Sequence, residues 1–472
     1  MHSQAGNMGP LLGLALTACG PAGLAADSSG SAPAPDDSRP WRRGLPPLAE
    51  EVEAPRGWLP VRSVIHLHSP WSHDACDGQG IQSGVPAADC LEDLRSALCT
   101  AGVDFAFITD HPDHAATVPW DDMLLRQAGD TIIDGPWGPM GHEIGCPTGH
   151  TVTWLPGIED DLMPVALQRH AGTGELSEAH ALYNRSDAQA IAASREAGAL
   201  VFVNHPEGRT REEMSEFQDA GGTGIEVFNL HAAFDPRIRS ADLGLEPASW
   251  LSDIQPFTSP EGTAEPDLFV LGVLEPQVPS LAHWDQLSTR SATVGVTGTD
   301  AHQNVMPVPL RDGERGDGYR RMLRWLNTTL LVEDRTVESA RTALASGRAY
   351  VAFEALGTPA GVDLHHRAED GEIVEMGGTA TAGGHLEVGC VSLSADSPRG
   401  LEAPEVTIAV LRDGTPWAEG CGAHAVTTPG VYRVEISLTP HHLTPFLGDS
   451  PEVWMKTYPW VYTNPIRITA AP

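Results

Sequence analysis

The stretch Val61-Arg62-Ser63-Val64-Ile65-His66-Leu67-His68 carries the fold prediction, because an apolar, β-like segment leads directly into two histidines. These histidines stand two residues apart, so on a strand both imidazoles project from one face and can bind one metal ion. Asp300-Ala301-His302 repeats the spacing after another apolar run. The pattern predicts metal ligands at the ends of strands.

Apolar or β-branched runs that lead into His, Asp, Asn or Glu recur along the chain from Val61 to about residue 302. The predicted strands and the polar residues that follow them are Val61–Ile65 with His66 and His68, Val103–Ile108 with Asp110 and His111, Thr151–Ile158 with Glu159, Leu200–Val203 with His205, Ile225–Phe228 with Asn229 and His231, Leu268–Leu274 with Glu275, and Thr293–Val296 with Asp300 and His302. Helical patterns lie between them, at Ala87–Ala101, Asp187–Gly198 and Glu212–Ala220. Strands that alternate with helices indicate a parallel sheet, and ligands at strand C-termini are typical of a closed α/β barrel, here of about seven strands.

A single histidine in a strand is more often a packed or surface residue than a metal ligand. Here two closely spaced pairs occur together with further histidines and carboxylates at other strand ends. Packing in the core or exposure at the surface does not explain why so many histidines and carboxylates stand at the ends of predicted strands. A metal centre shared by several strands is the better interpretation.

Length and charge restrict the class of protein. The chain has 472 residues, enough for about two or three ordinary domains. Its 63 Asp and Glu outnumber 29 Lys and Arg, and the net charge is −34 at pH 7. This charge repels phosphate backbones and anionic lipid headgroups, so we expect a small-molecule substrate and no nucleic-acid partner. No apolar run approaches the ~18 residues of a membrane-spanning helix.

The N-terminal sequence contains an apolar run that ends in Leu16-Thr17-Ala18-Cys19 and resembles a bacterial lipoprotein signal. No Lys or Arg precedes the run, and a turn of a buried helix would show the same pattern. We interpret residues 1–19 as a lipoprotein-type signal peptide and residues 20–56, rich in Ala, Ser, Pro, Gly and Asp, as a disordered tether. The protein is then exported and lipid-anchored through Cys19 at the bacterial cell envelope, on its periplasmic or extracellular face.

The cysteine count fits export. If Cys19 carries lipid, an even six cysteines are left: Cys76, Cys90, Cys99, Cys146, Cys390 and Cys421. An even number suits an oxidising compartment. Cys390 and Cys421 lie in or near β-like segments, and we expect them to pair. Buried free thiols are the alternative.

The motifs, in their order, resemble the PHP family, the polymerase and histidinol phosphatase domain. Ile65-His66-Leu67-His68-Ser69 followed by Ser72-His73-Asp74 resembles its first motif, and Ile108-Thr109-Asp110-His111 its second. Later motifs are similar to Gly157-Ile158-Glu159, Asn204-His205-Pro206 and Gly298-Thr299-Asp300-Ala301-His302. Asp312-Gly313-Glu314-Arg315 and Tyr319-Arg320-Arg321 are similar to a subgroup that includes carbaryl-hydrolase-like enzymes.

The resemblance implies an α/β fold, a distorted (β/α)7 barrel over residues 57–348, with two or three divalent ions (Zn, Mn or Fe). It implies that His66, His68, Glu159 and Asp300 bind the first ion. Glu159 then bridges to a second ion, completed by His205 and His231. His111 and His302 bind a third, and either His73 or Asp74 is its remaining ligand.

Amidohydrolases are a rival class, because they also open with a His-x-His pair and close with an aspartate. Many of their two-metal members bridge the ions with a carboxylated lysine. The single lysine here, Lys456, lies far outside the predicted barrel. A bridge through Glu159 fits better.

Two adjacent divalent ions lower the pKa of a bridging water, so the expected reaction is hydrolysis by a metal-bound hydroxide. Asp300 could guide the proton, and His114 or His142 could protonate the leaving group. Phosphoester hydrolysis is the commonest activity of the family. Its substrate oxygens need cationic partners, for which the candidates are Arg209, Arg315 and Arg320.

Two alternatives stay open. Amide, ester or carbamate hydrolysis would use the same ions and an apolar pocket, whose walls could be Trp71, Trp120 and Trp154. A protein of another class, a surface lipoprotein with structural ions and no catalysis, would show the same ligand motifs.

The pattern changes after two predicted helices, Tyr319–Asn327 and Thr336–Ser346. Short alternating stretches then follow, separated by Gly and Pro: His385–Leu393, Glu405–Leu411, Gly430–Leu438 and Trp460–Ile468. They predict a C-terminal all-β sandwich over residues 349–472. The histidine pairs at 365–366 and 441–442 are expected at its surface.

Overall fold

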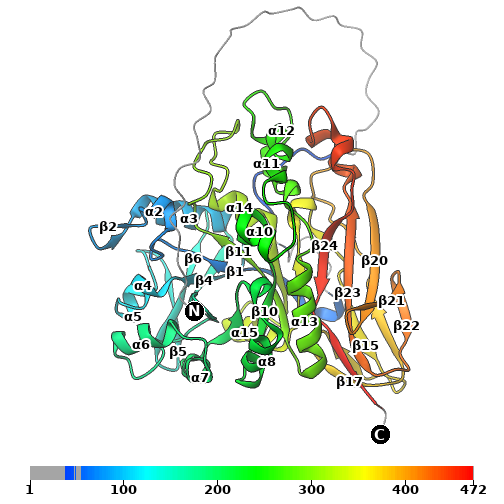
Figure 1. The fold of residues 1–472 in the computed structure, drawn as a ribbon, viewed down its shortest axis with the longest axis horizontal. Helices are drawn as coiled ribbons and strands as arrows, with labels where there is room; N and C mark the ends of the chain where they lie inside the picture. Colours follow the sequence, from blue (N-terminus) through cyan, green and yellow to red (C-terminus); the bar gives the residue numbers. More distant parts are fainter. Residues whose placement is uncertain (1–37, 47, 49–54, 471–472) are drawn as a thin grey trace, which may run out of the picture. The chain divides into compact units, whose positions relative to one another are not determined.

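Six of the described strands run parallel within one large sheet. In spatial order they are β9 (Leu200–Val203), β10 (Gly224–Asn229), β11 (Val294–Ala301), β1 (Leu59–Leu67), β4 (Phe105–Asp110) and β7 (Thr151–Ile158). Figure 1 labels four of them, β1, β4, β10 and β11. The predicted ligands lie at or just after the ends of these strands. β1, β4 and β10 are buried along almost their whole length, as expected for strands covered on both faces. Parallel strands share one carboxyl edge, so the residues that follow them meet there.

The computed structural model describes residues 38–46, 48 and 55–470, which belong to one unit of the chain. The signal peptide predicted for residues 1–19, with Cys19, lies outside the described residues. Most of the tether predicted for residues 20–56 also lies outside them.

The predicted strand Leu268–Leu274 is wrong. This run belongs to a 3₁₀ helix, η3 (Pro266–Gly272), all of whose residues are buried. Pro266 favours a helical start, and periodicity alone does not distinguish a short buried helix from a buried strand. Glu275 consequently does not join the ligands, and its carboxylate lies 3.4 Å from Arg239 Nη2.

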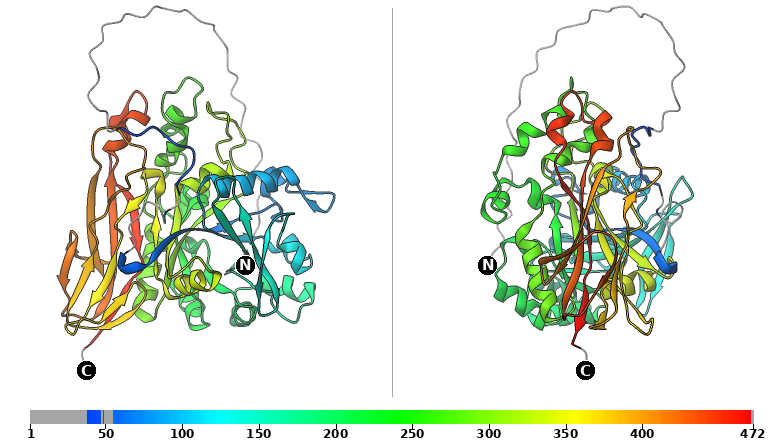
Figure 2. Two further views of the ribbon diagram at one scale, coloured as in Figure 1. Left: turned by 180° about the vertical axis from the view of Figure 1, so that it is seen from behind. Right: turned by 90° about the vertical axis from the view of Figure 1, so that its right-hand side faces the viewer.

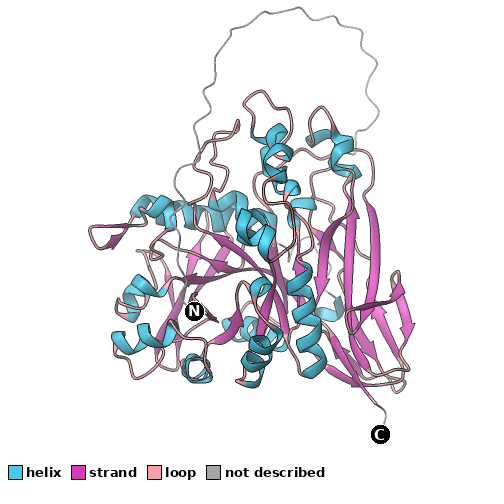
Figure 3. Cartoon of the chain, in the orientation of Figure 1, coloured by secondary structure: helices cyan, strands magenta, loops and turns pink. Residues whose placement is uncertain are grey.

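Antiparallel strands flank the parallel ones. β8 (Met163–Val165) pairs with β9, and the hairpin of β5 (Thr131–Gly135) and β6 (Gly138–Gly145) extends the sheet beside β7. Among the described pairings no ladder joins β7 to β8, so the closed (β/α)7 barrel stays a prediction. The fold is mixed α/β, with one large sheet and separate antiparallel sheets (Figure 3).

Helices form at the five places where the apolar periodicity predicts them: α3 (Ala88–Thr100), α7 (Ala188–Glu196), α8 (Arg211–Asp219), α14 (Tyr319–Trp325) and α15 (Val337–Ser346). A further helix, α13 (Val278–Arg290), was not predicted. A capping box begins α8, because Thr210 and Glu213 satisfy each other's backbone N–H groups. In the described part of the chain no helix has both the length and the hydropathy needed to cross a membrane.

The large sheet continues into the C-terminal region. β12 (Asn327–Val332) lies antiparallel to β1, β13 (Ala349–Ala352) pairs with β12, and β24 (Tyr458–Thr463) pairs with β13. The C-terminal strands, orange and red in Figure 2, lie along one side of the parallel strands. Residue 349 therefore begins a strand that joins the two predicted domains through main-chain hydrogen bonds.

A second, four-stranded antiparallel sheet completes the C-terminal region. Its order is β16 (Ile373–Glu375), β15 (Leu364–Arg367), β18 (His385–Val388) and β22 (Gly422–Ala425). Leu364 and Leu386 of this sheet are buried, as are Val410 and Val434 of the large sheet. The C-terminal β-sandwich stays a prediction.

The histidine pairs were expected at the surface, and this prediction is wrong for three of the four residues. His365, His366 and His442 are buried. The Nε2 atoms of His366 and His442 lie 2.6 and 2.9 Å from the carbonyl oxygens of Gly383 and Leu356. Main-chain acceptors thus make burial of these rings tolerable.

Three disulfides join the six cysteines outside the predicted signal. The expected pair Cys390–Cys421 is confirmed. The other two bonds are Cys76–Cys90 and Cys99–Cys146. Both lie in the region of the parallel sheet, and both involve α3.

Residues 38–46 fall within the predicted tether, yet they pack against the folded unit. The Trp41 indole N–H donates to Asp267 Oδ2 at 3.0 Å, and its ring lies 4.2 Å from the Arg324 guanidinium carbon. This segment therefore differs from the detached chain that its composition predicts. Local composition does not report a contact with residues more than 200 positions away.

Asp267 is the buried centre of an arginine cluster. Its Oδ1 lies 2.6 Å from Arg320 Nη2 and 2.5 Å from Arg321 Nη1, and Arg324 Nε is 4.0 Å from Oδ2. Burial opposes ionisation, but the arginines, with Arg320 first, hold the pKa of Asp267 at about 2. Arg320 is consequently not a free cation for substrate.

We predict that Asp267→Asn destabilises the fold by about 3–5 kcal/mol, because it leaves buried arginines without their counter-charge. Urea unfolding at pH 7 measures the loss. Glu402→Gln, at an exposed position, is the control and should change stability by less than about 0.5 kcal/mol. Equal stability of the two variants would contradict the prediction.

Candidate metal centre

Histidine and carboxylate side chains from all six parallel strands meet at their carboxyl edge. The sequence predicts this convergence, and the side chains do lie close together in the structure. The converging residues are His66, His68, Asp74, His111, Glu159, His205, His231, Asp300 and His302. Their role as ligands stays a prediction.

Three of these residues have a left-handed backbone. The φ angles are 59° at His66, 47° at His205 and 48° at Asp300. This region is uncommon for residues other than glycine and costs free energy. Each strand therefore bends at its ligand, and the bend turns the side chain toward the shared centre.

Asp300 is the carboxylate that the imidazoles surround. Its Oδ1 lies 3.3 Å from the Nε2 atoms of both His66 and His68. Its Oδ2 lies 3.5 Å from His205 Nε2 and 3.2 Å from His231 Nδ1. One carboxylate from β11 thus faces donors from β1, β9 and the segment after β10.

Glu159, at the end of β7, spans two sides of the cluster. Its Oε1 lies 4.0 Å from His66 Nε2 and 3.6 Å from His205 Nε2. Its Oε2 lies 2.9 Å from His111 Nδ1. This placement suits the bridging role that the family resemblance implies.

A further group of donors lies around His302. Its ring stacks on that of His68 with centroids 3.6 Å apart. Asp74 Oδ1 lies 3.5 Å from His302 Nε2 and 3.7 Å from His111 Nε2. His73 also lies near His111, but its Nδ1 is 3.8 Å from the exposed carboxylate of Asp113. Of the two alternatives, Asp74 reaches more of this group.

These residues fit a divalent cation. Ligands about 2.1 Å from one ion lie about 3.0–3.5 Å from each other, and many of the donor separations fall near this range. Buried polar atoms normally have hydrogen-bond partners. Among the buried side-chain atoms that lack one in the described residues, five belong to this cluster: His66 Nε2, His68 Nε2, Asp74 Oδ1, His205 Nδ1 and His302 Nε2. Other such atoms lie elsewhere in the fold, but here three of them are imidazole Nε2 atoms that face carboxylate oxygens, as an ion-binding site requires.

Supporting residues orient two of the imidazoles. Glu226, buried in β10, places Oε1 2.6 Å from His66 Nδ1. Ser72 places its hydroxyl 2.7 Å from His68 Nδ1 and donates to Asp110 at 3.0 Å. Such contacts leave Nε2 free for metal. Glu226 is not among the residues predicted for the site, although a carboxylate inside the otherwise apolar run Ile225–Phe228 is a usable signal.

Burial and neighbouring charges shift the protonation of the cluster. Burial, together with His302 and His111, lowers the pKa of His68 well below its usual value. Burial alone would raise the pKa of Asp300, but the surrounding histidines, His66 first, hold this pKa well below the usual range. A neutral imidazole and an ionised carboxylate are the forms that bind metal.

The predicted residues outside this cluster lie in varied places. Arg209 is half-buried and donates to the Asp161 carbonyl oxygen at 2.6 Å. His114 is exposed on α4 (Pro112–Ala115), and no described contact joins its side chain to the cluster. His142 is buried on β6 and stacks on Trp154, so it does not face the centre as a proton donor.

The three tryptophans do not form the expected wall of an apolar pocket. Trp71 and Trp154 belong to the hydrophobic core. Trp120 packs against that core, and its indole N–H donates to the Pro139 carbonyl oxygen at 2.7 Å.

Arg315 is paired with Asp77, which lies near Asp74 at the rim of the cluster.

No protein-family model and no curated protein matches this sequence. A solved structure from Bacteroides vulgatus ATCC 8482 is weakly similar, with a TM-score of 0.32 and 13% sequence identity. It is a two-domain protein containing a predicted PHP-like metal-dependent phosphoesterase. The alignment covers 87% of this chain and 98% of that chain.

We predict that Glu226→Gln lowers affinity for Zn²⁺ or Mn²⁺ by about 10–100-fold, because it weakens the partner that orients His66. Isothermal titration measures the affinity. Glu402→Gln serves again as the control, since its exposed carboxylate lies in the C-terminal region. Unchanged affinity in the Glu226 variant would refute this role.

Metal binding should release protons. Burial disfavours the charged imidazole, but Glu159 outweighs it and raises the pKa of metal-free His111 to about 10. The ring is therefore protonated at pH 8 and must lose its proton to bind metal. Affinity should rise with pH below 10, and titrations in buffers of different ionisation enthalpy should report proton release. Binding without proton release would contradict the assignment.

Proposed function

We propose that this protein is a multinuclear metal-dependent hydrolase of the PHP type, and that it hydrolyses a phosphoester. The observation that carries the proposal is the convergence of His66, His68, Glu159, His205 and Asp300, in which the Nε2 atoms of His66 and His68 are buried without a hydrogen-bond partner. The order of the sequence motifs supports the PHP assignment.

Each group of donors has the composition of a cation site. The ligand atoms of each group lie within 4.8 Å of one another, and the groups at this centre are His66–His68–Asp300, His66–Glu159–His205, His68–His111–His302 and His73–Asp74–His111. The first two share His66, and the first and third share His68. Because the Nε2 atom of one histidine binds a single ion, each shared histidine would serve one of the overlapping groups, and the carboxylate of Glu159 could bridge two ions. Groups that overlap lie close together, so two or three Zn, Mn or Fe ions would bind as one cluster.

When bound, such ions lower the pKa of water and polarise the oxygen under attack. The protein residues bind and orient. Asp300, which lies near His66 and His205, would accept a proton from the attacking water. Arg209, beside the segment that follows Glu159, would bind a non-bridging substrate oxygen through N–H groups not used on Asp161.

Two features favour a phosphoester over an amide, ester or carbamate. A neutral carbonyl substrate would profit from an apolar wall, but Trp71, Trp120 and Trp154 pack into or against the core instead. A phosphoryl group has oxygens for several cations at once, which suits a cluster of donor groups.

We also propose that the chain is exported and anchored through Cys19. Three disulfides in the described residues suit an oxidising compartment. The charge of −34 makes nucleic acid an unfavourable partner.

The test is an activity panel on protein loaded with Mn²⁺ or Zn²⁺ and analysed for metal content. Substrates are a phosphomonoester, a phosphodiester, a carboxylic ester, an anilide and a carbamate, each releasing nitrophenol or nitroaniline. Wild-type protein should hydrolyse a phosphoester, and His66→Ala, Glu159→Gln or His205→Ala should remove metal and at least about 10³-fold of the rate.

His385→Ala is the matched control, because this exposed histidine lies on β18 in the separate sheet. It should retain metal and rate. Turnover that survives chelation would refute the mechanism. Stoichiometric metal without turnover on any substrate would favour a non-catalytic surface lipoprotein.

A further inference from the structure

Asp74, like its neighbour His73, lies in a short loop and not at the end of a strand. It precedes α2 (Ala75–Gly78), a single turn in which Cys76 and Asp77 have φ angles of 52° and 57°. These left-handed conformations are costly for residues other than glycine. The loop therefore needs outside contacts to keep this shape.

The Asp74 carboxylate is turned toward the histidines by a single side-chain contact. Asn304 donates to Asp74 Oδ2 at 3.0 Å. Asp74 Oδ1 is buried without a hydrogen-bond partner and lies 3.5 Å from His302 Nε2. The side chain is 34% exposed, so packing alone holds it weakly.

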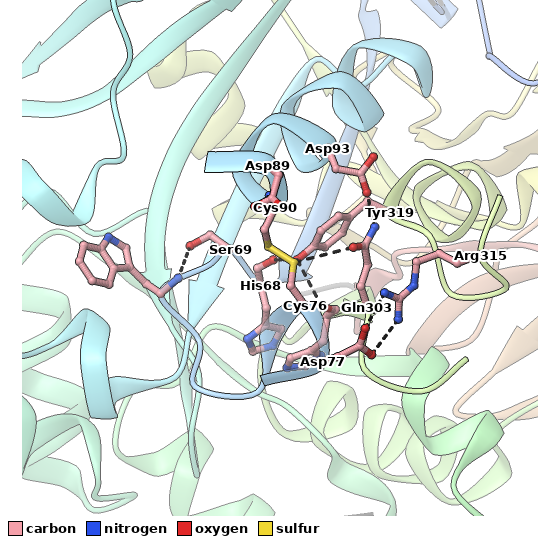
Figure 4. Close-up of a disulfide and its surroundings, with 12 residues drawn as sticks. His68, Ser69, Cys76, Asp77, Asp89, Cys90, Asp93, Gln303, Arg315 and Tyr319 are labelled. Carbon is pink, nitrogen blue, oxygen red and sulfur yellow. Dashed lines mark hydrogen bonds and ion pairs between the residues drawn. A yellow bond between two sulfur atoms is a disulfide. The ribbon is translucent and has the colours of Figure 1, made fainter. Parts of the chain in front are cut away.

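A covalent bond joins this loop to a helix. Cys76 forms a disulfide with Cys90, in the first turn of α3 (Figure 4). α3 buries Leu94 and Leu98 in the core, so it is a firm anchor. The disulfide begins only two residues after Asp74.

Non-covalent contacts hold the same loop against the segment that follows β11 and contains His302. The Cys76 N–H donates to the His302 carbonyl oxygen at 2.8 Å, and the Asp77 N–H donates to that of Gln303 at 2.9 Å. Two N–H groups of Arg315 donate to the two carboxylate oxygens of Asp77 at 2.9 and 3.0 Å (Figure 4).

Helix α3 and the main chain at His68 are also linked to this part of the structure by hydrogen bonds. The Gln303 amide donates to Asp93 of α3. The buried Tyr319 hydroxyl donates to the His68 carbonyl oxygen at 3.0 Å. Figure 4 shows the disulfide between α3 and the loop, beside Tyr319 and Gln303. Helix α3, the Asp74 loop and the main chain at two ligands thus form one connected unit.

We propose that the Cys76–Cys90 disulfide is a positioning element for the metal centre. It holds the Asp74 carboxylate where it completes a cation site with His111 and His302. The inference rests on the metal centre of the proposed function but not on the reaction. Without the bond, the strained loop can relax, and this site loses its carboxylate while the site of His66, Glu159, His205 and Asp300 is retained.

The test compares wild-type protein with Cys76→Ser/Cys90→Ser after loading with Mn²⁺. Equilibrium dialysis with elemental analysis counts the ions, and titration calorimetry gives their affinities. We expect the affinity of one ion to fall at least tenfold, with the others unchanged. Asp74→Asn should cause the same loss, and adding it to the cysteine variant should cost little more, because both changes act on one ligand.

The matched control is Cys390→Ser/Cys421→Ser, which removes a disulfide in the C-terminal region. It should keep the full ion count. If the Cys76→Ser/Cys90→Ser variant does not fold, Asp77→Asn keeps the disulfide but weakens the Arg315 contact, and it should weaken the same ion. Full ion count and affinity in the cysteine variant, or an equal loss in the control, would overturn the proposal.

Activity on a phosphoester is measured in the same samples. It distinguishes a failure of the proposed function from a failure of the positioning role of the disulfide. Wild-type protein that binds the ions without turnover would refute the proposed function, while the ion count would still test the disulfide. Turnover with an ion count that does not depend on the disulfide would refute only the positioning role.

Discussion

The structure depends on a carboxylate surrounded by imidazoles. Asp300 has His66 and His68 beside one oxygen, and His205 and His231 beside the other. In a buried space, imidazole nitrogens and carboxylate oxygens that face one another with no hydrogen between them repel each other and lack hydrogen bonds. A cation bound between them removes both costs. This requirement explains why the Nε2 atoms of His66, His68 and His302 have no partner within the described residues.

The parallel strands bring these polar groups together, and the packing of the strands offsets the free-energy cost of burying them. β1 lies between β11 and β4, so its end reaches donors from both neighbours. Left-handed φ angles at His66, His205 and Asp300 turn the chain at the sheet edge. Buried apolar side chains on these strands stabilise the sheet and offset the cost of the bends.

Other buried charges stabilise the surroundings of the centre. Asp267 is neutralised by arginines of α14, whose first residue, Tyr319, also holds the main chain of His68. β13 and β24 attach the C-terminal sheets to the same large sheet. The C-terminal region is therefore part of the scaffold that supports the centre and not a separate attachment.

Local patterns in the sequence determined the strands, the helices and the donors that end the strands, because apolar periodicity and His-x-His spacing are encoded by neighbouring residues. Leu268–Leu274 shows the limit, since a short buried helix and a buried strand have the same apolar composition. Only the tertiary structure decided that Glu226 lies beside His66, that the Asp74 carboxylate lies 3.5 Å from His302 Nε2, and that Trp71 and Trp154 pack inward. These outcomes depend on contacts between residues far apart in the chain, which no local pattern contains.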